Sequence, residues 1–372
     1  MKQEMKQQDQ NRLDGYIAQV QQRSKTFLGY PISRDFDYSE LYDLLKYPLN
    51  NLGDPLIEST YDLNSRSIER EVISFFADIF KAPVDNSWGY VTNGGSEGNL
   101  YSIYVARELY PNAIVYYSEA THYCVQKNIH LLNMPSILIR ADDKGEMDYA
   151  DLKDVIQLNR NQPAIVVANI GTTMTEAKDD IGKIKQVLKN SAIRSHYIHC
   201  DAALAGTYLA LLETDPQFSF EDGADSIAIS GHKFIGSPIP CGVVIVKKSY
   251  KERIGQTIPY IGTLDTTITG SRNGHSPLFL WYTIKKLGKE GLLKRAINSL
   301  EIADYTEKKL NDNGIKAWRN KNALTVVFPE PSESIRHKWQ LASENGWSHI
   351  ICMPGVTKDQ IDDFLKDVIE KK

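Results

Sequence analysis

The chain has 372 residues, of which 42% are hydrophobic and 24% charged, as expected for a globular protein with a large core and two or three domains. The formal net charge of −4 provides no basic field, and no apolar run is long enough to span a bilayer, so neither nucleic acid nor a membrane is expected as a partner. The four widely spaced cysteines form no CxxC pair, which disfavours a zinc or other metal site and a disulfide framework and predicts a cytoplasmic protein: Cys124, Cys200, Cys241 and Cys352.

The first segment, residues 1–60, is predicted to be an arm that packs against another surface. Its start at 1–12 is polar and Gln-rich and lacks the apolar stretch of a signal peptide. Farther along, aromatic residues gather at Phe36, Tyr38, Tyr42 and Tyr47. These aromatic side chains need a partner surface that the arm itself does not supply.

A helix is predicted to follow the arm. Asn64 or Ser65 is suited to cap its N-terminus, because both side chains can accept a hydrogen bond from a free backbone N–H. The apolar residues then recur at helical spacing: Ile68, Val72, Phe75, Phe76, Ile79 and Phe80.

From residue 88 onward, short β-rich runs alternate with helix-like stretches. These runs are 113–117, 164–170, 196–200 and 226–229. The alternation predicts a parallel sheet with crossover helices. The run 241–246 follows too closely for a helical crossover, so we expect it to be an antiparallel neighbour.

The last third of the chain is predicted to be a smaller α+β domain. A long helical stretch, 278–303, precedes a strand-like run at 323–328 and an amphipathic tail at 360–369. We therefore expect a large domain over 61–280 and a small domain over 281–372. The predicted class is α/β, with a mostly parallel sheet in the large domain.

Polar residues follow several of the predicted strands, at the edge where an open parallel sheet binds its ligands. They are Thr121-His122, Gly171-Thr172-Thr173, Asp201-Ala202-Ala203 and Ser230-Gly231-His232-Lys233. Upstream, the run from Thr92 to Asn99 contains Gly94, Gly95 and Ser96 and opens a helix. Free N–H groups and the helix dipole make such a start suitable for a phosphate.

Taken singly, each feature also has an ordinary structural interpretation. The glycine-rich segment fits a turn, Asp201 fits a helix N-cap, and His122 fits a structural histidine. Lys233 fits a surface lysine at a strand end. The alternative for Lys233 is desolvation, which lowers the pKa of its amine and creates the nucleophile that a Schiff base requires.

Together the features match the requirements of pyridoxal phosphate. Lys233 would form the imine, Asp201 would pair with the ring nitrogen and keep it protonated, and His122 would lie over the ring. Ala203 lies on the same side of an extended chain as Asp201 and is small enough for the ring to pack against it. The glycine-rich helix start would hold the phosphate.

Longer motifs, in order along nearly the whole chain, resemble the group II pyridoxal-phosphate-dependent amino-acid decarboxylases of fold type I. The subgroups most similar are the bacterial histidine decarboxylases and the plant serine decarboxylases. The motifs that carry the resemblance are Gly29-Tyr-Pro, Asp35-Phe-Asp-Tyr, Trp88-Gly-Tyr-Val-Thr-Asn-Gly-Gly, Asn169-Ile-Gly-Thr-Thr, Ser230-Gly-His-Lys, Pro238-Ile-Pro-Cys-Gly and Gly270-Ser-Arg-Asn-Gly-His.

The resemblance implies a carboxy-lyase that releases CO2 and a primary amine. It places the imine on Lys233 and the ring contacts on Asp201 and His122. It adds Ser230 and His232 to the phosphate site, with Gly94, Gly95 and Ser96. It places Thr172 or Thr173 in the lining of the cofactor pocket.

The resemblance also implies a homodimer with active sites at its interface. The loop with Ser271 and Arg272 would reach the cofactor of the partner. Tyr260 is a candidate for returning a proton to Cα, with a core or interface tyrosine as the equal alternative; His122 is the other candidate donor.

The substrate is left open among small polar amino acids. Residues 53–59, 279–282 and 352–357 are closer to the plant serine enzymes, whereas 169–174 and 317–322 agree with the bacterial histidine enzymes. Histidine, serine and aspartate all fit this mixture.

Two other functions remain as alternatives. An aminotransferase would use the same cofactor site and clamp the substrate carboxylate with an arginine, for which Arg319 is the candidate. A non-catalytic scaffold is disfavoured, because Lys233, Asp201 and His122 are all present.

Overall fold

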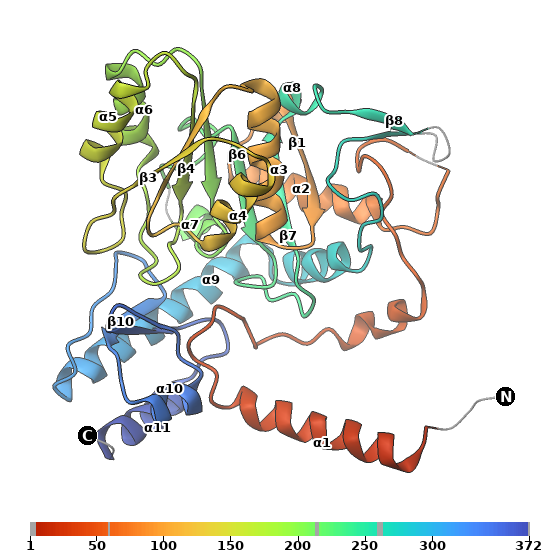
Figure 1. Cartoon of the computed structure of the whole chain (residues 1–372). Coiled ribbons are helices and arrows are strands. Elements are labelled where there is room, and N and C mark those ends of the chain that lie inside the picture. Colours follow the sequence, from red (N-terminus) through yellow and green to blue (C-terminus); the bar gives the residue numbers. More distant parts are fainter. Residues whose placement is uncertain (1–4, 59, 213–215, 259–262, 371–372) are drawn as a thin grey trace.

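The computed structural model of the protein describes residues 5–58, 60–212, 216–258 and 263–370. A seven-stranded sheet forms its centre (Figure 1). The strand order is β1-β7-β6-β5-β4-β2-β3, and β7 alone runs antiparallel to its neighbours. Its strands are β1 (Ser87–Thr92), β2 (Ile114–Ser118), β3 (Ser136–Ile139), β4 (Ala164–Asn169), β5 (His196–Asp201), β6 (Ser226–Ser230) and β7 (Gly242–Lys247).

Helices cover both faces of this sheet, as apolar strands that alternate with amphipathic helices require. On one face, α3 and α4 pack over strand residues such as Tyr197 and Val167. On the other face, α2, α5, α6, α7 and the start of α9 pack over residues such as Ile198 and Val166. These helices are α2 (Arg66–Ile79), α3 (Gly95–Leu109), α4 (Tyr123–Leu131), α5 (Tyr149–Leu158), α6 (Ile181–Asn190), α7 (Gly206–Leu212) and α9 (Ser276–Asp312).

The antiparallel strand β7 explains how the chain returns beside β6 without a helix. Ser230 pairs with Gly242, and the short connection between them is a series of turns. Parallel strands would need a crossover of a dozen or more residues. The predicted α/β class and the antiparallel neighbour are confirmed.

A second, three-stranded sheet lies near the C-terminus, beside the end of α9 (Figure 1). The helix α9 passes from the large sheet to this unit and bends at Gly288, whose φ of 62° is not helical. The small unit contains β10 (Thr325–Pro329), β11 (Ser343–Glu344), β12 (Trp347–Ile351), α10 (Glu333–Trp339) and α11 (Lys358–Glu370). Its own apolar core includes Val326, Ile350 and Phe364.

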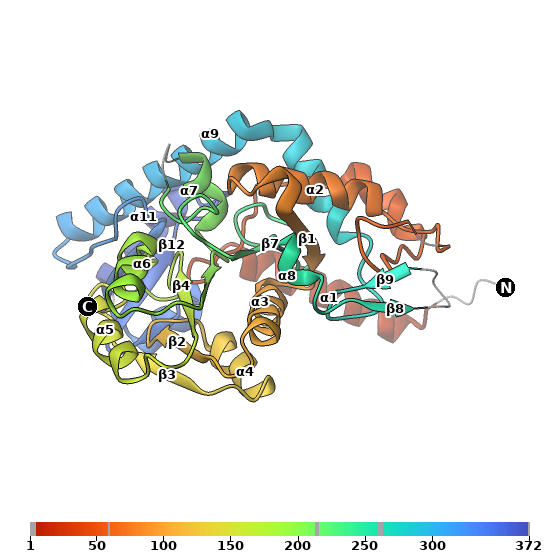
Figure 2. The same ribbon diagram turned by 90° about the horizontal axis from the view of Figure 1, so that it is seen from above.

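The remaining elements lie at the periphery. They are α1 (Gln7–Ser24), the 3-10 turns η1 (Ser39–Lys46) and η2 (Val84–Asn86), the short helix α8 (Lys248–Lys251), and the hairpin β8 (Gln256–Ile258) and β9 (Thr263–Asp265). Figure 2 shows the hairpin extending beyond the edge of the large sheet. Within the ranges given above, none of the helices has the length and hydropathy needed to cross a membrane.

The predicted helix after the arm is α2, and of the two predicted capping residues it is Asn64 whose side chain accepts a hydrogen bond from the start of the helix. Ser65 occupies the N-cap position, while Asn64 Oδ1 accepts a hydrogen bond from the Arg66 amide at 3.0 Å. Val72 and Phe76 lie in the core, as the spacing predicts.

Candidate active site

The carboxyl edge of the large sheet brings Asp201, Lys233 and His122 together. Asp201 is the last residue of β5, while Lys233 lies in the turn after β6 and His122 follows β2. The charge of Asp201 raises the pKa of both Lys233 and His122, and the charge of Lys233 lowers the pKa of His122. The three side chains are therefore close enough to interact electrostatically.

Asp201 is a buried carboxylate with capacity left for another donor. It is 6% exposed. Its Oδ2 accepts a hydrogen bond from Asn99 Nδ2 at 2.7 Å, and its Oδ1 accepts one from the Ala203 amide at 3.2 Å. A carboxylate has about four acceptor sites, so it can also accept a hydrogen bond from a protonated ring nitrogen.

Lys233 has the lowered pKa that an amine nucleophile needs. Desolvation is the largest cause, and attraction to Asp201, Cys124 and Glu176 offsets it only in part. The backbone of this turn is held from the arm, because Ser33 Oγ donates to the Lys233 carbonyl at 2.7 Å. The amine is thus carried on a fixed segment in an environment that favours its neutral form.

His122 is the N-cap of α4 and is neutral. Its Nδ1 accepts a hydrogen bond from the Cys124 amide at 3.2 Å, which leaves the proton on Nε2. Burial lowers the pKa of the ring, and the nearby charge of Asp201 offsets this in part. The ring is half-buried, and it can therefore face a ligand.

The start of α3 forms a cradle suited to a phosphate. Gly94 is its N-cap with a φ of 153°. A Cβ atom added at Gly95 would lie 2.5 Å from Ser230 Oγ and 3.3 Å from Ala203 Cβ. This crowding shows that Gly95, Ser230 and Ala203 adjoin one another, and that only glycine leaves its amide accessible there.

Ser96 and His232 lie in the same region with different contacts. The Ser96 carbonyl accepts a hydrogen bond from Asn128 Nδ2 at 2.9 Å, which fixes the first turn of α3. His232 Nδ1 lies 2.9 Å from the Cys241 carbonyl oxygen, and burial lowers the pKa of its ring. The hydrogen bond ties the His232 ring to the start of β7.

Thr172 and Ser271 make their side-chain hydrogen bonds with residues outside this cluster. The Thr172 hydroxyl lies 3.0 Å from Thr175 Oγ1 and accepts from the Ala177 amide at 2.9 Å. The exposed Ser271 accepts a hydrogen bond from Asn50 Nδ2 at 3.1 Å. Their predicted cofactor contacts stay predictions, and Tyr260 lies outside the described residues.

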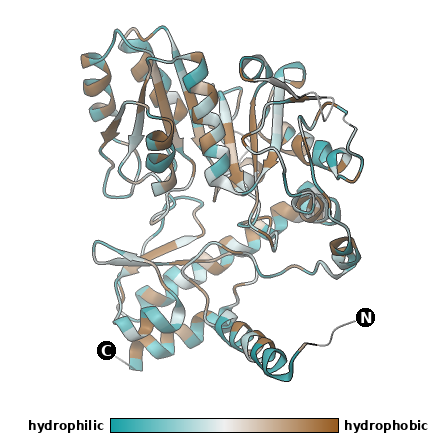
Figure 3. Ribbon diagram, turned by 45° about the vertical axis from the view of Figure 1, so that its right-hand side comes forward, coloured by the Kyte–Doolittle hydropathy of each residue, from teal (hydrophilic) through white to brown (hydrophobic). Residues whose placement is uncertain are grey.

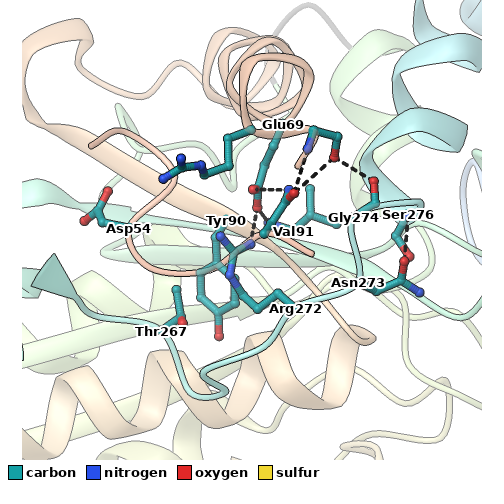
Figure 4. A network of polar contacts seen from close by, with 12 residues as sticks. Asp54, Glu69, Tyr90, Val91, Thr267, Arg272, Asn273, Gly274 and Ser276 are labelled. Carbon is teal, nitrogen blue, oxygen red and sulfur yellow. Dashed lines mark hydrogen bonds and ion pairs between the residues drawn. The ribbon is translucent and has the colours of Figure 1, made fainter. Parts of the chain in front are cut away.

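The residue after Ser271 is anchored inside its own chain. Arg272 is 4% exposed, forms an ion pair with the buried Glu69 and lies over the Tyr90 ring, 5.4 Å from its centroid. Figure 4 shows its guanidinium beside Tyr90 and directed toward Glu69. Of this loop, therefore, it is Ser271 and not Arg272 that is available at the surface.

Arg319, the arginine that an aminotransferase would need, is committed to the small unit. It forms ion pairs with Asp304 and Glu307, the latter at 3.0 Å, and donates to the Ala323 carbonyl at 3.0 Å. A guanidinium with these partners has little capacity left to clamp a substrate carboxylate. This observation weighs against transamination.

Sequence reasoning missed two polar residues behind Asp201. Asn99 donates to Asp201, and His199 contacts Asn99 at 2.9 Å. His199 and Asp201 are two positions apart in β5 and therefore lie on the same face of the sheet. This spacing was the signal from which the position of His199 beside Asp201 could have been predicted. Their link to Asn99 requires knowing that α3 covers that face.

The donor set fits pyridoxal phosphate. The site has a desolvated amine, a carboxylate for the ring nitrogen, a neutral histidine beside both and a glycine cradle that a Cβ would fill.

Comparison with known proteins gives matches over nearly the whole chain. The family model described as the pyridoxal-dependent decarboxylase conserved domain matches residues 57–328. A histidine decarboxylase of Mesorhizobium japonicum is 48% identical over 361 residues, covering 97% of this chain and 98% of the relative. One of Vibrio anguillarum is 48% identical over 345 residues, covering 92% and 89%.

Among solved structures, L-methionine decarboxylase from Streptomyces sp. 590 has a TM-score of 0.92 at 24% identity, covering 99% of this chain and 95% of that one. Glutamate decarboxylase of Lactobacillus brevis has a TM-score of 0.81 at 19% identity, covering 100% and 93%. These likenesses establish the fold alone, and they agree with fold type I.

Proposed function

Because the chain belongs to the pyridoxal-dependent decarboxylase family, we propose that it removes the α-carboxyl group of L-histidine and releases histamine. The chain is a carboxy-lyase, and its cofactor is pyridoxal phosphate. The observation that carries the choice of histidine is the 48% identity to a histidine decarboxylase over 97% of this chain.

The roles of the site residues form part of the proposal. When bound, pyridoxal phosphate supplies a ring that accepts the electron pair left at Cα as CO2 departs. Lys233 would bind the cofactor covalently, Asp201 would hold the proton on its ring nitrogen, and His122 would contact the ring. The start of α3, with Ser230, would bind the phosphate through backbone N–H groups and a hydroxyl.

Proton return to Cα needs a donor near the ring. His122 carries its proton on Nε2, because Nδ1 accepts from the Cys124 amide, so it can donate from the free side of the ring. Tyr260 stays the second candidate, since nothing described bears on it.

Serine and aspartate remain the competing substrates. Within the segment that resembles the plant serine enzymes, the exposed Glu58 pairs with Arg70 at 2.8 Å, and Arg66 donates to the Ile57 carbonyl at 2.9 Å. The charge of Glu58 is therefore already matched by an arginine.

The experiment is mass spectrometry of the amines formed from an equimolar mixture of the twenty amino acids by the cofactor-loaded protein. Histamine as the dominant product is expected. Ethanolamine as the dominant product would identify serine as the substrate instead, and β-alanine would identify aspartate. Keto acids without any amine would overturn the assignment as a decarboxylase.

Lys233→Ala tests the role of the lysine. We expect the variant to fold but to lose multiple-turnover decarboxylation, because the amine that binds the cofactor and later displaces the product is gone. Circular dichroism checks the fold. Appreciable turnover by this variant would remove Lys233 from the assignment.

A homodimer with sites at its interface is also proposed, as is a cytoplasmic location. The dimer is supported by the exposed apolar stripe of α1, which includes Tyr16, Ile17 and Val20. The location is supported by the four cysteines, all of which are buried and unpaired in disulfides, as is usual in a reducing compartment.

A further inference from the structure

A linear network of hydrogen bonds runs through the core and joins four polar side chains, namely Asp201 and three residues behind it. Ser226 Oγ lies 2.8 Å from His199 Nδ1, His199 Nε2 lies 2.9 Å from Asn99 Oδ1, and Asn99 Nδ2 lies 2.7 Å from Asp201 Oδ2. Ser226 and His199 are 0% exposed, and Asn99 is 1% exposed. Such groups are costly to bury, so an arrangement that extends from β6 to the site needs a reason.

The chemistry of the four side chains determines which group donates in each hydrogen bond of this network. The carboxylate of Asp201 can only accept, so Asn99 must turn its NH2 group toward it. The Asn99 oxygen therefore faces His199, which must donate from Nε2. His199 Nδ1 is then an acceptor, and the Ser226 hydroxyl donates to it.

His199 acts here as a neutral ring. Burial is the largest cause of a lowered pKa of about 4, and the charge of Asp201 offsets it in part. A neutral histidine adds no charge beside Asp201, so its contribution is orientation. The second N–H of Asn99 is also used, since Asn99 Nδ2 lies 3.4 Å from Cys124 Sγ.

We propose that His199, held by Ser226, is a positioning residue that locks the Asn99 amide with its N–H toward Asp201 and so keeps that carboxylate oriented for the ring nitrogen of the cofactor. Without the His199 donor, the Asn99 oxygen would be buried without its hydrogen bond, and the amide could rotate. Rotation would set an oxygen against the carboxylate, which repels it. The inference rests on the proposed role of Asp201.

The test compares His199→Phe with His199→Gln. Phenylalanine fills the space but cannot donate, whereas a glutamine Nε2 can replace the histidine donor to Asn99 Oδ1. We expect His199→Phe to weaken pyridoxal phosphate binding and to lower kcat, each by about tenfold to a hundredfold, with KM little changed. His199→Gln should recover most of both losses.

The spectrum of the bound cofactor separates positioning from general stability. It should change in His199→Phe and return toward the parent spectrum in His199→Gln. The matched control is His349→Phe, because His349 is also buried and its ring nitrogens lie 3.0 and 3.1 Å from the backbone carbonyl oxygens of Met174 and Gly29. This control should lower stability and leave the cofactor spectrum and kcat unchanged.

Two further variants keep every outcome decisive. Ser226→Ala retains the ring but removes its support, and it should produce a smaller change of the same kind even if His199→Phe does not fold. An unchanged cofactor spectrum and affinity in Ser226→Ala would overturn the inference. So would an unchanged His199→Phe, or a loss of kcat in His199→Phe that His199→Gln does not recover. If Asp201→Ala also keeps the cofactor affinity and cofactor spectrum of the parent protein, the proposed role of Asp201 is wrong. If Asp201→Ala changes them and the His199 and Ser226 variants do not, the inference about His199 fails and the role of Asp201 stands.

Discussion

The amine of Lys233 is controlled by residues from several parts of the chain. Ser33 in the arm fixes the carbonyl of Lys233, and Arg295 of α9 donates to the carbonyl oxygens of Phe234 and Ile235, at 2.6 and 3.0 Å. Desolvation lowers the pKa of the amine, and Asp201 opposes this change. The protein thus sets both the position and the protonation of one nucleophile.

This balance predicts how cofactor loading depends on pH. The amine reacts only when deprotonated, so the rate of loading should rise with pH through a midpoint below the ordinary lysine value of about 10.4. Asp201 raises the pKa of Lys233, so Asp201→Asn should move the midpoint to lower pH. Stopped-flow absorbance with added pyridoxal phosphate measures both midpoints.

A free lysine derivative treated with the same aldehyde is the control for ionisation of the cofactor itself. Its midpoint should stay near the ordinary value. A parent midpoint equal to that of the free derivative would mean that the site does not activate Lys233.

The sequence alone predicted which residues belong to the candidate site better than it predicted the contacts between residues. Lys233, Asp201 and His122 each follow a predicted strand, and the order of strands in a parallel sheet brings them to one edge. The contact between His199 and Asn99 joins residues 100 positions apart. No local pattern contains that information, because it depends on which face of the sheet α3 covers.

Among the seven strands of the large sheet, five were predicted and two, β1 and β3, were not. β4 and β6 contain the continuous apolar runs 164–168 and 227–229, which mark strands covered on both faces. β1 contains Gly89, and an internal glycine argues against a strand. The structure explains it, because a Cβ atom at Gly89 would lie 2.2 Å from the Val244 carbonyl oxygen of β7. A close backbone approach therefore overrides propensity here.

The junction of α2, β1 and the loop before α9 depends on one buried ion pair. Glu69 of α2 is 0% exposed and pairs with Arg272. Glu69 Oε1 also accepts from the Val91 amide at 2.9 Å, and its Oε2 accepts from Asn51 Nδ2 at 2.8 Å. Removal of Arg272 would leave a buried charge with neutral donors only.

We therefore expect Arg272→Met to lower the free energy of unfolding by about 3–5 kcal/mol, the cost of breaking a buried pair on one side. Urea unfolding at a fixed protein concentration measures it. The matched control is Lys308→Met, which removes an exposed i,i+4 pair with Asp312 and should change stability by no more than about 0.5 kcal/mol. Equal effects of the two variants would contradict the importance given to Glu69.

For the whole molecule, α1 is the element whose stability the rest of the described chain does not explain. None of its residues is buried, and Figures 1 and 3 show it apart from the body of the protein. Its attachment is at the C-terminal end, where Arg23 donates to the His337 carbonyl at 2.9 Å. An isolated helix of 18 residues is only marginally stable in water, so α1 needs a second surface.

The apolar stripe on α1 indicates where that surface would contact it. Its four residues recur at helical spacing and are each at least 43% exposed: Leu13, Tyr16, Ile17 and Val20. If the stripe docks on a second copy of the chain, the double variant Ile17→Glu/Val20→Glu should shift the protein from dimer to monomer, because two buried carboxylates would be uncompensated. Sedimentation equilibrium measures the shift, and activity should fall with it if the sites lie at the interface.

The control is Asn11→Glu/Gln22→Glu on the opposite face of the helix, which adds the same charge and should leave the dimer intact. A dimer that withstands both double variants would exclude the α1 stripe from the interface, and a monomeric parent protein would overturn the proposed homodimer.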